Sequence, residues 1–434
     1  MTSLAQTLAR FATGPAPRDE DLARIVTLSL FDWAAVGLAG RDEPVARAAL
    51  RLAGTEPGGA TLFGGGGAAP RAAALANGAV SHALDYDDTH FGHIGHPSVA
   101  VMPAALALAE TRGASGGDLL AALGYGLETA CRIGDWLGRA HYEAGFHQTG
   151  TSGAFGAAVA AGRLIGLDAA GMEAALALTA TRAAGLKSQF GTMGKPLNAG
   201  FAAEVGVTCA LLAEAGAGSA AAALEGPQGF GPTHAGEARD AAFEDLGTRW
   251  VFPAVSYKFH ACCHGLHAML EALRELTPGL ETDTVEALEV TTHPRWLKVC
   301  NQPSPETGLG AKFSYRVTAA MALAGVDTAA LESYSAETCQ RPDIQALRDR
   351  VQVRTDEGLS DTEAHLRLRL SDGAERTARY DLLTDARPEE TAPRLRAKAE
   401  ALLGAEGAGA LWQAVEDLPG AGDVSGLAAR MGGG

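Results

Sequence analysis

A series of apolar runs, rich in Ala and Leu and each closed by glycine, fills the chain to about residue 250 and most constrains its fold. The run DEDLARIVTLSLFDWAAVGLAG, residues 19–40, has acidic residues in its first turn, apolar residues at helical spacing and glycine at its end. These features signal a helix, its start and its stop. Similar runs follow at 97–113, 116–140, 152–167, 169–185 and 201–216. We therefore predict an all-helical domain over residues 1–254.

The pattern changes after Pro253. Apolar and polar side chains alternate, as in strands, at 284–293, 351–356 and 364–383. Ser371-Asp372-Gly373 in the last stretch is typical of a hairpin turn. Helical runs separate the strands at 260–275, 314–324 and 343–350. We expect a smaller α+β domain over residues 255–394, helices over 395–434 that complete the first domain, and a mainly α fold.

The composition fits this plan. A chain of 434 residues has room for one large or two medium domains, and 47% hydrophobic residues supply a sizeable core. The chain also contains 55 glycines, and small residues allow helices to pack closely.

The net charge and the N-terminal sequence indicate which partners and locations to expect. A net charge of −16 argues against nucleic acid and anionic membranes. The N-terminus lacks the pattern of a signal peptide, and we find no convincing transmembrane run. We expect a cytoplasmic protein. Its six cysteines form no CxxC pair and are predicted to be free thiols.

The stretch SHALDYDDTHFGHIGHPS, residues 81–98, concentrates four histidines and three aspartates. His90, His93 and His96 form an HxxHxxH pattern, and imidazole is a common ligand of zinc, copper and iron. Glycines and a proline among them oppose a helix, so a metal site is only one alternative. Asp85 stands near two further carboxylates, where mutual repulsion raises pKa values and suits proton transfer. A solvated turn before a helix is the structural alternative.

A second polar stretch, HYEAGFHQTGTSGAFG, covers residues 141–156. It brings Tyr142, His147 and Thr149 to the start of a helix. Backbone N–H groups and hydroxyls at such a junction suit a carboxylate or phosphate. The hydroxyl residues could also simply cap the helix.

Two further polar stretches follow along the chain. Residues 185–200 hold Lys187 and Lys195 among glycines, where a lysine either reaches a substrate carboxylate or stays solvated. Residues 256–273 begin an apolar helix with a polar cluster. Its members are Lys258, His260, Cys262, Cys263, His264 and His267. Zinc is disfavoured there because adjacent cysteines rarely share one ion.

These clusters, in this order, resemble the MmgE/PrpD family, whose members include 2-methylcitrate dehydratase, cis-aconitate decarboxylase and iminodisuccinate epimerase. The motifs are DYDDTH with GHPSVAVMPAALALAE, then GASGGDLLAALGYGLE, GFHQTGTSGAFGAA, GTMGKPLNAGFAAEVGV, LEGPQGF and YKFHACC. The resemblance spans nearly the whole chain. It implies a large all-helical domain, a smaller α+β lid domain, an active cleft between them and a homodimer, without metal or organic cofactor.

The resemblance also implies which residues form the site. The catalytic candidates are Asp85, His96, His147, Lys195, His267 and Tyr142. The substrate-binding candidates are Thr89, which the resemblance implies, and Thr149, Lys258 and His264, which come from the polar stretches themselves. Tyr142 and Lys195 are similar to the pair that an epimerase of the family would place on opposite faces of a substrate carbon. One departure is Tyr315, which directly follows the FS pair, whereas the family often has a tyrosine a few residues later.

The residues and the resemblance indicate the same chemistry, in which a carbanion-like species next to a carboxylate is stabilised by cationic and neutral donors. We predict a cofactor-independent lyase that dehydrates or decarboxylates a small di- or tricarboxylate, with Asp85 as the partner of a histidine. One alternative is an epimerase or racemase of an imino- or aminodicarboxylate such as iminodisuccinate. Another is a metal-dependent or non-catalytic carboxylate-binding protein. His90 and His93 suit a rim or structural role as well as catalysis.

Overall fold

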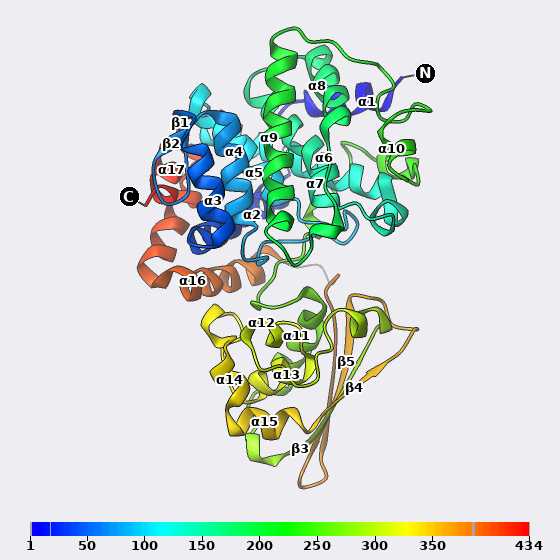
Figure 1. The fold of residues 1–434 in the computed structure, drawn as a ribbon, viewed down its shortest axis with the longest axis vertical. Helices are drawn as coiled ribbons and strands as arrows, with labels where there is room; N and C mark the ends of the chain where they lie inside the picture. The colour runs from blue at the N-terminus through cyan, green and yellow to red at the C-terminus, as the bar shows by residue number, and fades with distance from the viewer. Residues whose placement is uncertain (1, 18, 384–386, 434) are drawn as a thin grey trace. The chain divides into compact units, whose positions relative to one another are not determined.

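The computed structural model describes residues 2–17, 19–383 and 387–433 and divides the chain into two compact units. The first unit consists of Met1–Tyr257 and Pro388–Gly434, and the second of Lys258–Arg387. The expected boundaries at 254 and 394 are therefore displaced. The chain returns to the first unit at Pro388, where the helix α16 begins, so the helical C-terminal segment is longer than the predicted 395–434 (Figure 1).

The first unit is mainly helical, which confirms the pattern of apolar runs. Its helices are α1 (Leu4–Ala12), α2 (Glu20–Gly40), α3 (Pro44–Ala53), α4 (Pro70–Ser81), α5 (Ser98–Arg112), α6 (Gly116–Glu143), α7 (Gln148–Leu164), α8 (Ala169–Arg182), α9 (Gly194–Glu214), α10 (Phe230–Thr233), α16 (Pro388–Glu416) and α17 (Ser425–Met431). Local signals set several of these ends. Ser115 and Asp118 form a capping box at the start of α6, and Gly113 ends α5 with φ of 64°.

The expectation that this unit is all-helical is wrong in one place. The strands β1 (Pro57–Thr61) and β2 (Gly67–Ala68) form an antiparallel hairpin between α3 and α4. Three consecutive glycines from 64 to 66, all with positive φ, make its turn. The hairpin is anchored from outside, because the backbone N–H of Thr61 donates to Glu110 on α5 at 2.9 Å. Residues 64–69 thus form this turn together with β2.

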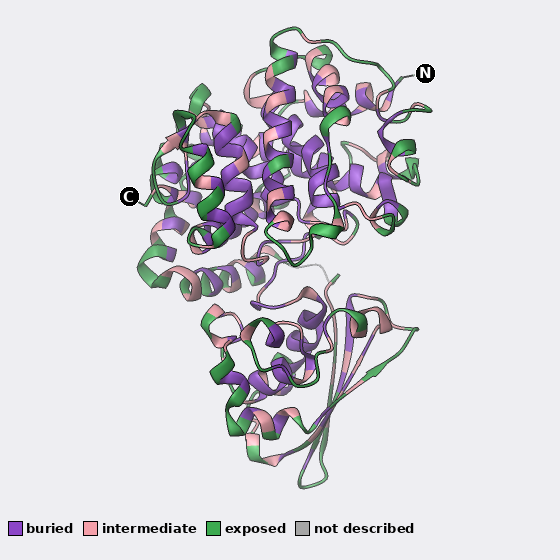
Figure 2. Cartoon of the chain, viewed as in Figure 1, coloured by how far each residue is buried: buried purple, intermediate pink, exposed green. Residues whose placement is uncertain are grey.

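Glycine allows the central helices to approach closely. A Cβ on Gly156 of α7 would lie 2.4 Å from the carbonyl oxygen of Gly126 on α6. A Cβ on Gly78 of α4 would lie 2.8 Å from the Cα of Gly200 on α9. Real Cβ atoms do not approach other atoms so closely, so these crossings require glycine. Figure 2 shows the helices of this core as mainly buried.

Two helices of the first unit, α2 and α9, are long and apolar enough to span a membrane by length and composition alone. In α2, 78% of the apolar window is buried inside the fold, and in α9 the share is 67%. Core helices of this kind pass the same test.

The second unit consists of a four-stranded sheet and short helices. Its strands are β3 (Val285–Thr292), β4 (Val351–Thr355), β5 (Glu363–Leu370) and β6 (Glu375–Asp381), in the order β4-β3-β5-β6. β3 pairs in parallel with β4 and antiparallel with β5, and β5 and β6 form a hairpin. Gly373, with φ of 84°, lies in the hairpin turn. The predicted strands and the mainly α fold with an α+β part are therefore confirmed.

The helices of this unit differ from the prediction at one end. They are α11 (His267–Leu276), α12 (Gly308–Ala311), α13 (Tyr315–Leu323), α14 (Ala336–Gln340) and α15 (Pro342–Arg348). The predicted helical run from 260 becomes α-helical only at His267. The backbone N–H groups of Ala261 and Cys263 instead donate to the carbonyls of Thr328 and Lys312. Those bonds to other segments replace the bonds that a helix would make.

Candidate active site

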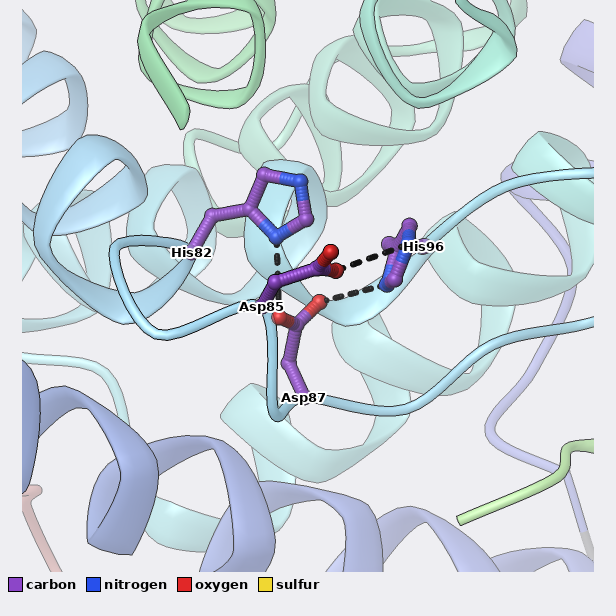
Figure 3. A group of neighbouring side chains, drawn as sticks. All are labelled: His82, Asp85, Asp87 and His96. Carbon is purple, nitrogen blue, oxygen red and sulfur yellow. Dashed lines mark hydrogen bonds and ion pairs between the residues drawn. The ribbon is translucent and has the colours of Figure 1, made fainter. Parts of the chain in front are cut away.

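The central site of the first unit lies on the irregular segment between α4 and α5. α4 ends at Ser81 and α5 begins at Ser98, so the HxxHxxH stretch is not helical and its histidines do not share a helix face. Asp85 has φ of 52°, the left-handed region that few residues other than glycine adopt. This local conformation brings four side chains of the segment together (Figure 3). They are His82, Asp85, Asp87 and His96.

Asp87 lies at the centre of this cluster and bridges two histidines. Its Oδ1 is 2.8 Å from Nδ1 of His82, and its Oδ2 is 2.9 Å from Nδ1 of His96. Burial opposes its ionisation, but the two imidazoles together hold the pKa of the Asp87 carboxyl well below its usual range. Burial lowers the pKa of His96 to about 4, although Asp87 acts in the opposite direction. Near neutral pH, we therefore infer an ionised carboxylate between two Nδ1–H donors.

Asp85 extends the cluster towards solvent and connects it to α9. Its Oδ1 lies 3.5 Å from Nε2 of His96, and its Oδ2 lies 2.6 Å from Nζ of Lys195. The Asp85 side chain is 46% exposed and that of Lys195 is 15% exposed, whereas Asp87 is fully buried. The polar chain from Lys195 through Asp85 and His96 to Asp87 thus runs from an accessible edge into the core.

His147 lies next to this chain and has a fixed tautomer. The side-chain amide nitrogen of Asn198 is 3.0 Å from Nδ1 of His147, and it also donates to the carbonyl of Leu186 at 3.3 Å. Because that nitrogen is a donor, Nδ1 of His147 accepts and Nε2 carries the proton. Burial, with Lys195 next in effect, holds the pKa of His147 well below its usual value. His147 is therefore a neutral donor near neutral pH.

The four side chains in Figure 3 could also hold a metal ion. Each offers one ligand atom, and these four atoms lie within 4.8 Å of one another. Two imidazoles and two carboxylates are plausible zinc ligands. The separations of 2.8 and 2.9 Å are hydrogen-bond lengths, whereas tetrahedral ligands about 2.0–2.1 Å from zinc stand roughly 3.3 Å apart. The ammonium of Lys195 already neutralises Asp85. The arrangement therefore suits proton transfer better than metal binding.

Three other predicted residues of the first unit have different surroundings. Thr149 is fully buried, and its Oγ1 accepts from the backbone N–H of His96 at 3.0 Å, so it holds the histidine in place. Thr89 pairs with the backbone of Ser256 through two N–H···O bonds of 2.9 and 2.7 Å. The ring of Tyr142 lies 3.7 Å from Nζ of Lys187. A role for Tyr142 opposite Lys195 stays a prediction.

The sequence left open whether His90 and His93 act in catalysis or support the fold. In the structure, both are packed against backbone. Nε2 of His90 lies 2.8 Å from the carbonyl of Val251, and its Nδ1 accepts from the backbone N–H of His93 at 3.0 Å. The His93 ring packs so closely that a Cβ on Gly134 would lie 2.6 Å from it. Burial lowers the pKa of His93 to about 3, so its ring is neutral.

The second unit carries the other predicted residues. His267 is buried at the start of α11, with its ring centroid 4.8 Å from that of His264 and 5.1 Å from that of His260. Burial, followed by the nearby histidines and Lys258, holds the pKa of His267 well below its usual value. His260 is 3.2 Å from the buried carboxylate of Glu271. That residues 258–271 join the first-unit cluster in one site stays a prediction.

Tyr315 has a structural role in this unit. The Tyr315 hydroxyl donates to the carbonyl of Gly265 at 2.6 Å and lies 3.2 Å from Oγ1 of Thr292. It thus fixes the turn before α11 rather than facing solvent. The six cysteines, all within the described residues, are free thiols, as predicted.

Sequence reasoning missed three residues of the first-unit site: His82, Asp87 and Asn198. His82 directly follows α4, and Asp87 is one of three nearby carboxylates, so neither stood out by residue type. Asn198 lies within the PLNAG segment of α9 and carried no signal. Asp87 and Asn198 each contact a predicted histidine, and His82 contacts Asp87. Only the folded chain establishes these contacts.

The fold and this cluster define a mainly helical protein with a buried carboxylate–imidazole network, an arrangement suited to moving protons. Residues 6–241 match the MmgE/PrpD N-terminal domain, and residues 260–413 match the MmgE/PrpD C-terminal domain. The chain therefore belongs to the MmgE/PrpD family.

Curated relatives of this chain include several cis-aconitate decarboxylases. The Aspergillus terreus protein is 33% identical over 222 residues, which cover 48% of this chain and 45% of that protein. The Homo sapiens protein is 30% identical over 310 residues, which cover 65% of this chain and 61% of that protein. A cis-aconitate decarboxylase-like protein of Aspergillus oryzae is 32% identical over 224 residues, 48% of this chain and 46% of that protein. The match thus spans about half the length of the fungal relatives.

Proposed function

We propose that this protein is a lyase that acts on a small di- or tricarboxylate, with decarboxylation of a cis-aconitate-like substrate as the first candidate. Membership of the MmgE/PrpD family and similarity to proteins named cis-aconitate decarboxylase support the reaction class. The observation that carries the proposal is the chain of contacts from Lys195, which is partly buried, through the exposed Asp85 and through His96 to the buried Asp87. It supplies one cationic group at an open edge and a protected path for a proton.

A decarboxylation of this kind needs the groups that this site provides. The bond between the leaving carboxylate and its neighbouring carbon breaks, and CO₂ departs. The electron pair forms a new double bond, the original alkene pair moves to the carbon next to another carboxylate, and that carbon takes one proton. The protein must therefore stabilise negative charge and supply one proton.

The residues divide these tasks in the proposed mechanism. The Lys195 ammonium binds a substrate carboxylate and delivers the proton, and the Nε2–H of His147 donates to a second carboxylate. Asp85 and His96 return a proton to Lys195. Asp87 holds His96 with its Nδ1 protonated, so Nε2 of His96 is free to accept a proton. General acid-base steps of this kind contribute about 10² to 10⁴ in rate.

Incubation of the purified protein in D₂O with cis-aconitate, citrate, methylcitrate and aminodicarboxylates, followed by NMR, tests the proposal. We expect CO₂ release and one deuteron in the product for a decarboxylase, or loss of water for a hydro-lyase. Lys195→Met, purified identically, controls for contaminating activity. Deuterium exchange next to a carboxylate without loss of CO₂ or water would identify an epimerase instead. A folded protein that turns over none of these compounds would refute the lyase proposal.

The absence of a cofactor, the homodimer and the cytoplasmic location stay predictions. Activity that survives a chelator tests the first. Analytical ultracentrifugation tests the second, since a sedimenting species of one chain mass would contradict it.

A further inference from the structure

We propose that Lys398, on the C-terminal helix α16, is a positioning residue that sets the conformation of the loop carrying Asp85 and Asp87. This inference rests on the proposed function, because that function gives the loop its role. Lys398 lies far along the chain from the loop, after the second unit, and belongs to none of the motifs considered above.

The burial of Lys398 requires an explanation. Its side chain is only 2% exposed, and lysine is almost never buried to this extent unless it is paired. Its Nζ lies 2.7 Å from Oδ1 of Asp32 on α2, whose side chain is also 2% exposed. A buried ion pair is weak evidence for stability, because desolvation offsets much of the attraction. A role beyond simple stabilisation is therefore worth testing.

The second contact of Lys398 reaches the site loop itself. Its Nζ donates to the backbone carbonyl of Tyr86 at 2.7 Å and lies 4.1 Å from the centroid of the Tyr86 ring. Tyr86 stands between Asp85 and Asp87. Its carbonyl belongs to the peptide group that joins Tyr86 to Asp87, so the hydrogen bond fixes the plane from which Asp87 projects.

The loop needs such an anchor because its backbone is strained at the adjacent residue. Asp85 has φ of 52°, a conformation that is unfavourable for a residue with a Cβ and persists only when the surroundings impose it. Lys398 contacts both the carbonyl and the ring of the next residue. A charge-assisted hydrogen bond in a dry environment is among the stronger contacts that a loop carbonyl can receive.

Several acidic side chains are buried around the loop. Asp32, Asp87 and Asp88 are all buried; beyond burial itself, Asp87 helps to raise the pKa of Asp32, and Asp87 and Asp32 help to raise the pKa of Asp88. Lys398 supplies a positive charge from outside the loop, whereas the His82 and His96 partners of Asp87 come from within the segment. The helix that follows the second unit thus completes the support of the first-unit site.

Hydrogen–deuterium exchange of peptides covering residues 82–98, measured without substrate, tests the positioning role directly. Several amides of this segment are hydrogen-bonded, for example Thr89 to Ser256 and His96 to Thr149, so a loosened loop exchanges faster. The variant is Lys398→Met, which keeps an unbranched stem without the ammonium. Arg396→Met is the matched control, because Arg396 is exposed on the same helix and stacks on Trp412.

The double variant Asp32→Leu with Lys398→Met separates positioning from charge neutralisation. Replacing a buried pair with apolar side chains commonly preserves stability. If Lys398 acts through the Tyr86 carbonyl, the double variant unfolds at a denaturant concentration near that of the native protein, but its 82–98 peptides still exchange faster. It also keeps KM within about twofold while kcat falls by about 10²-fold, the scale for a misplaced reacting group.

Either of two results would overturn the proposal: native exchange of residues 82–98 in Lys398→Met, or a return to native exchange in the double variant. The double variant also answers the question if Lys398→Met alone does not fold. The proposed function fails separately. A wild-type protein without turnover but with a responsive loop would refute the lyase alone, whereas an active protein whose loop does not respond would refute the positioning role alone.

Discussion

Replacing Asp87 with Asn should reduce turnover much more than stability. The substitution keeps the shape of the side chain but removes its charge and one of its two acceptor oxygens. Asp87 now accepts from Nδ1 of His82, and its second oxygen lies 2.9 Å from Nδ1 of His96. An Asn accepts from one of them and presents an N–H group to the other. That second histidine must move its proton from Nδ1 to Nε2, so the native pair of tautomers cannot persist.

The expected magnitudes follow from these contacts. A hydrogen bond to a charged group contributes about 1.5–3 kcal/mol and a neutral one about 0.5–1.5 kcal/mol. Losing the charge at two bonds therefore costs about 1–3 kcal/mol of unfolding free energy, partly offset because the ion is no longer buried. If His96 takes the wrong tautomer, the acid-base chain is broken and kcat falls by about 10² to 10⁴, or roughly 3–5 kcal/mol.

The assay combines steady-state kinetics with ¹⁵N NMR of the imidazoles, which reports the tautomer without any substrate. Asp88→Asn is the matched control, because Asp88 is the adjacent residue and is also buried. Burial raises the pKa of Asp88 to about 8 even though Ser98 donates to it. Asp88 is therefore mostly protonated at pH 7, and its replacement changes little charge. We expect near-native turnover from this control.

Two results would refute this reasoning about Asp87. One is an Asp87→Asn protein with turnover within tenfold of the native value and unchanged imidazole shifts. The other is an equal loss in Asp87→Asn and Asp88→Asn, which would mean that any change in this buried layer disrupts the fold.

Three further expectations concern the tautomer of a neighbouring histidine, the pH dependence of stability and helix packing. In Asn198→Asp, the new carboxylate should accept a hydrogen bond from Nδ1 of His147, so the ring proton moves from Nε2 to Nδ1 and turnover falls. If ¹⁵N NMR shows that Nε2 still carries the proton, this expectation is wrong. From about pH 4 to 8, folded Asp88 keeps a proton that the unfolded chain has released, so the stability that Asp88 contributes falls as pH rises. Denaturant unfolding at pH 5 and 8 should therefore show the unfolding free energy of Asp88→Asn rising relative to that of the native protein. An equal difference between the two proteins at both pH values would contradict this. Gly156→Ala should lose about 1–3 kcal/mol, since its Cβ would lie 2.4 Å from a carbonyl oxygen of α6. Gly409→Ala, in open space on α16, should gain up to about 1 kcal/mol, and equal losses in denaturant unfolding would argue against close packing as the cause.

Much of the fold was predictable because its signals are local. Helical spacing and closing glycines placed α2 and α5 to α9 of the first unit, and two-residue alternation placed the strands of the second. The β1–β2 hairpin was missed because a run of glycines shows no alternation, and it is held by Glu110 from α5. The return of the chain to the first unit was predicted at 395, but its start at Pro388, where α16 packs against α2, is not shown by a local pattern.

The site was predictable as a set of stretches but not as a set of contacts. Equal spacing in HxxHxxH suggested that His90, His93 and His96 act together, yet the segment is not helical, and only His96 reaches the Asp87 cluster. His82 was overlooked because its importance comes from its contact with Asp87. Such contacts depend on a left-handed residue and on neighbouring helices, so residue types and spacing could not supply them.

The small residues that suggested close helix packing are also what bring the site together. Gly78 and Gly200 allow α4 and α9 to touch, since a Cβ on either would meet the other helix within 3 Å. His82 follows Gly78 by four positions, and Lys195 precedes Gly200 by five, so this crossing holds the end of α4 beside the start of α9. Lys195 can then reach Asp85, which lies just after α4. The glycine-rich composition is thus connected to the chemistry, because larger residues at the crossing would separate the lysine from the carboxylates.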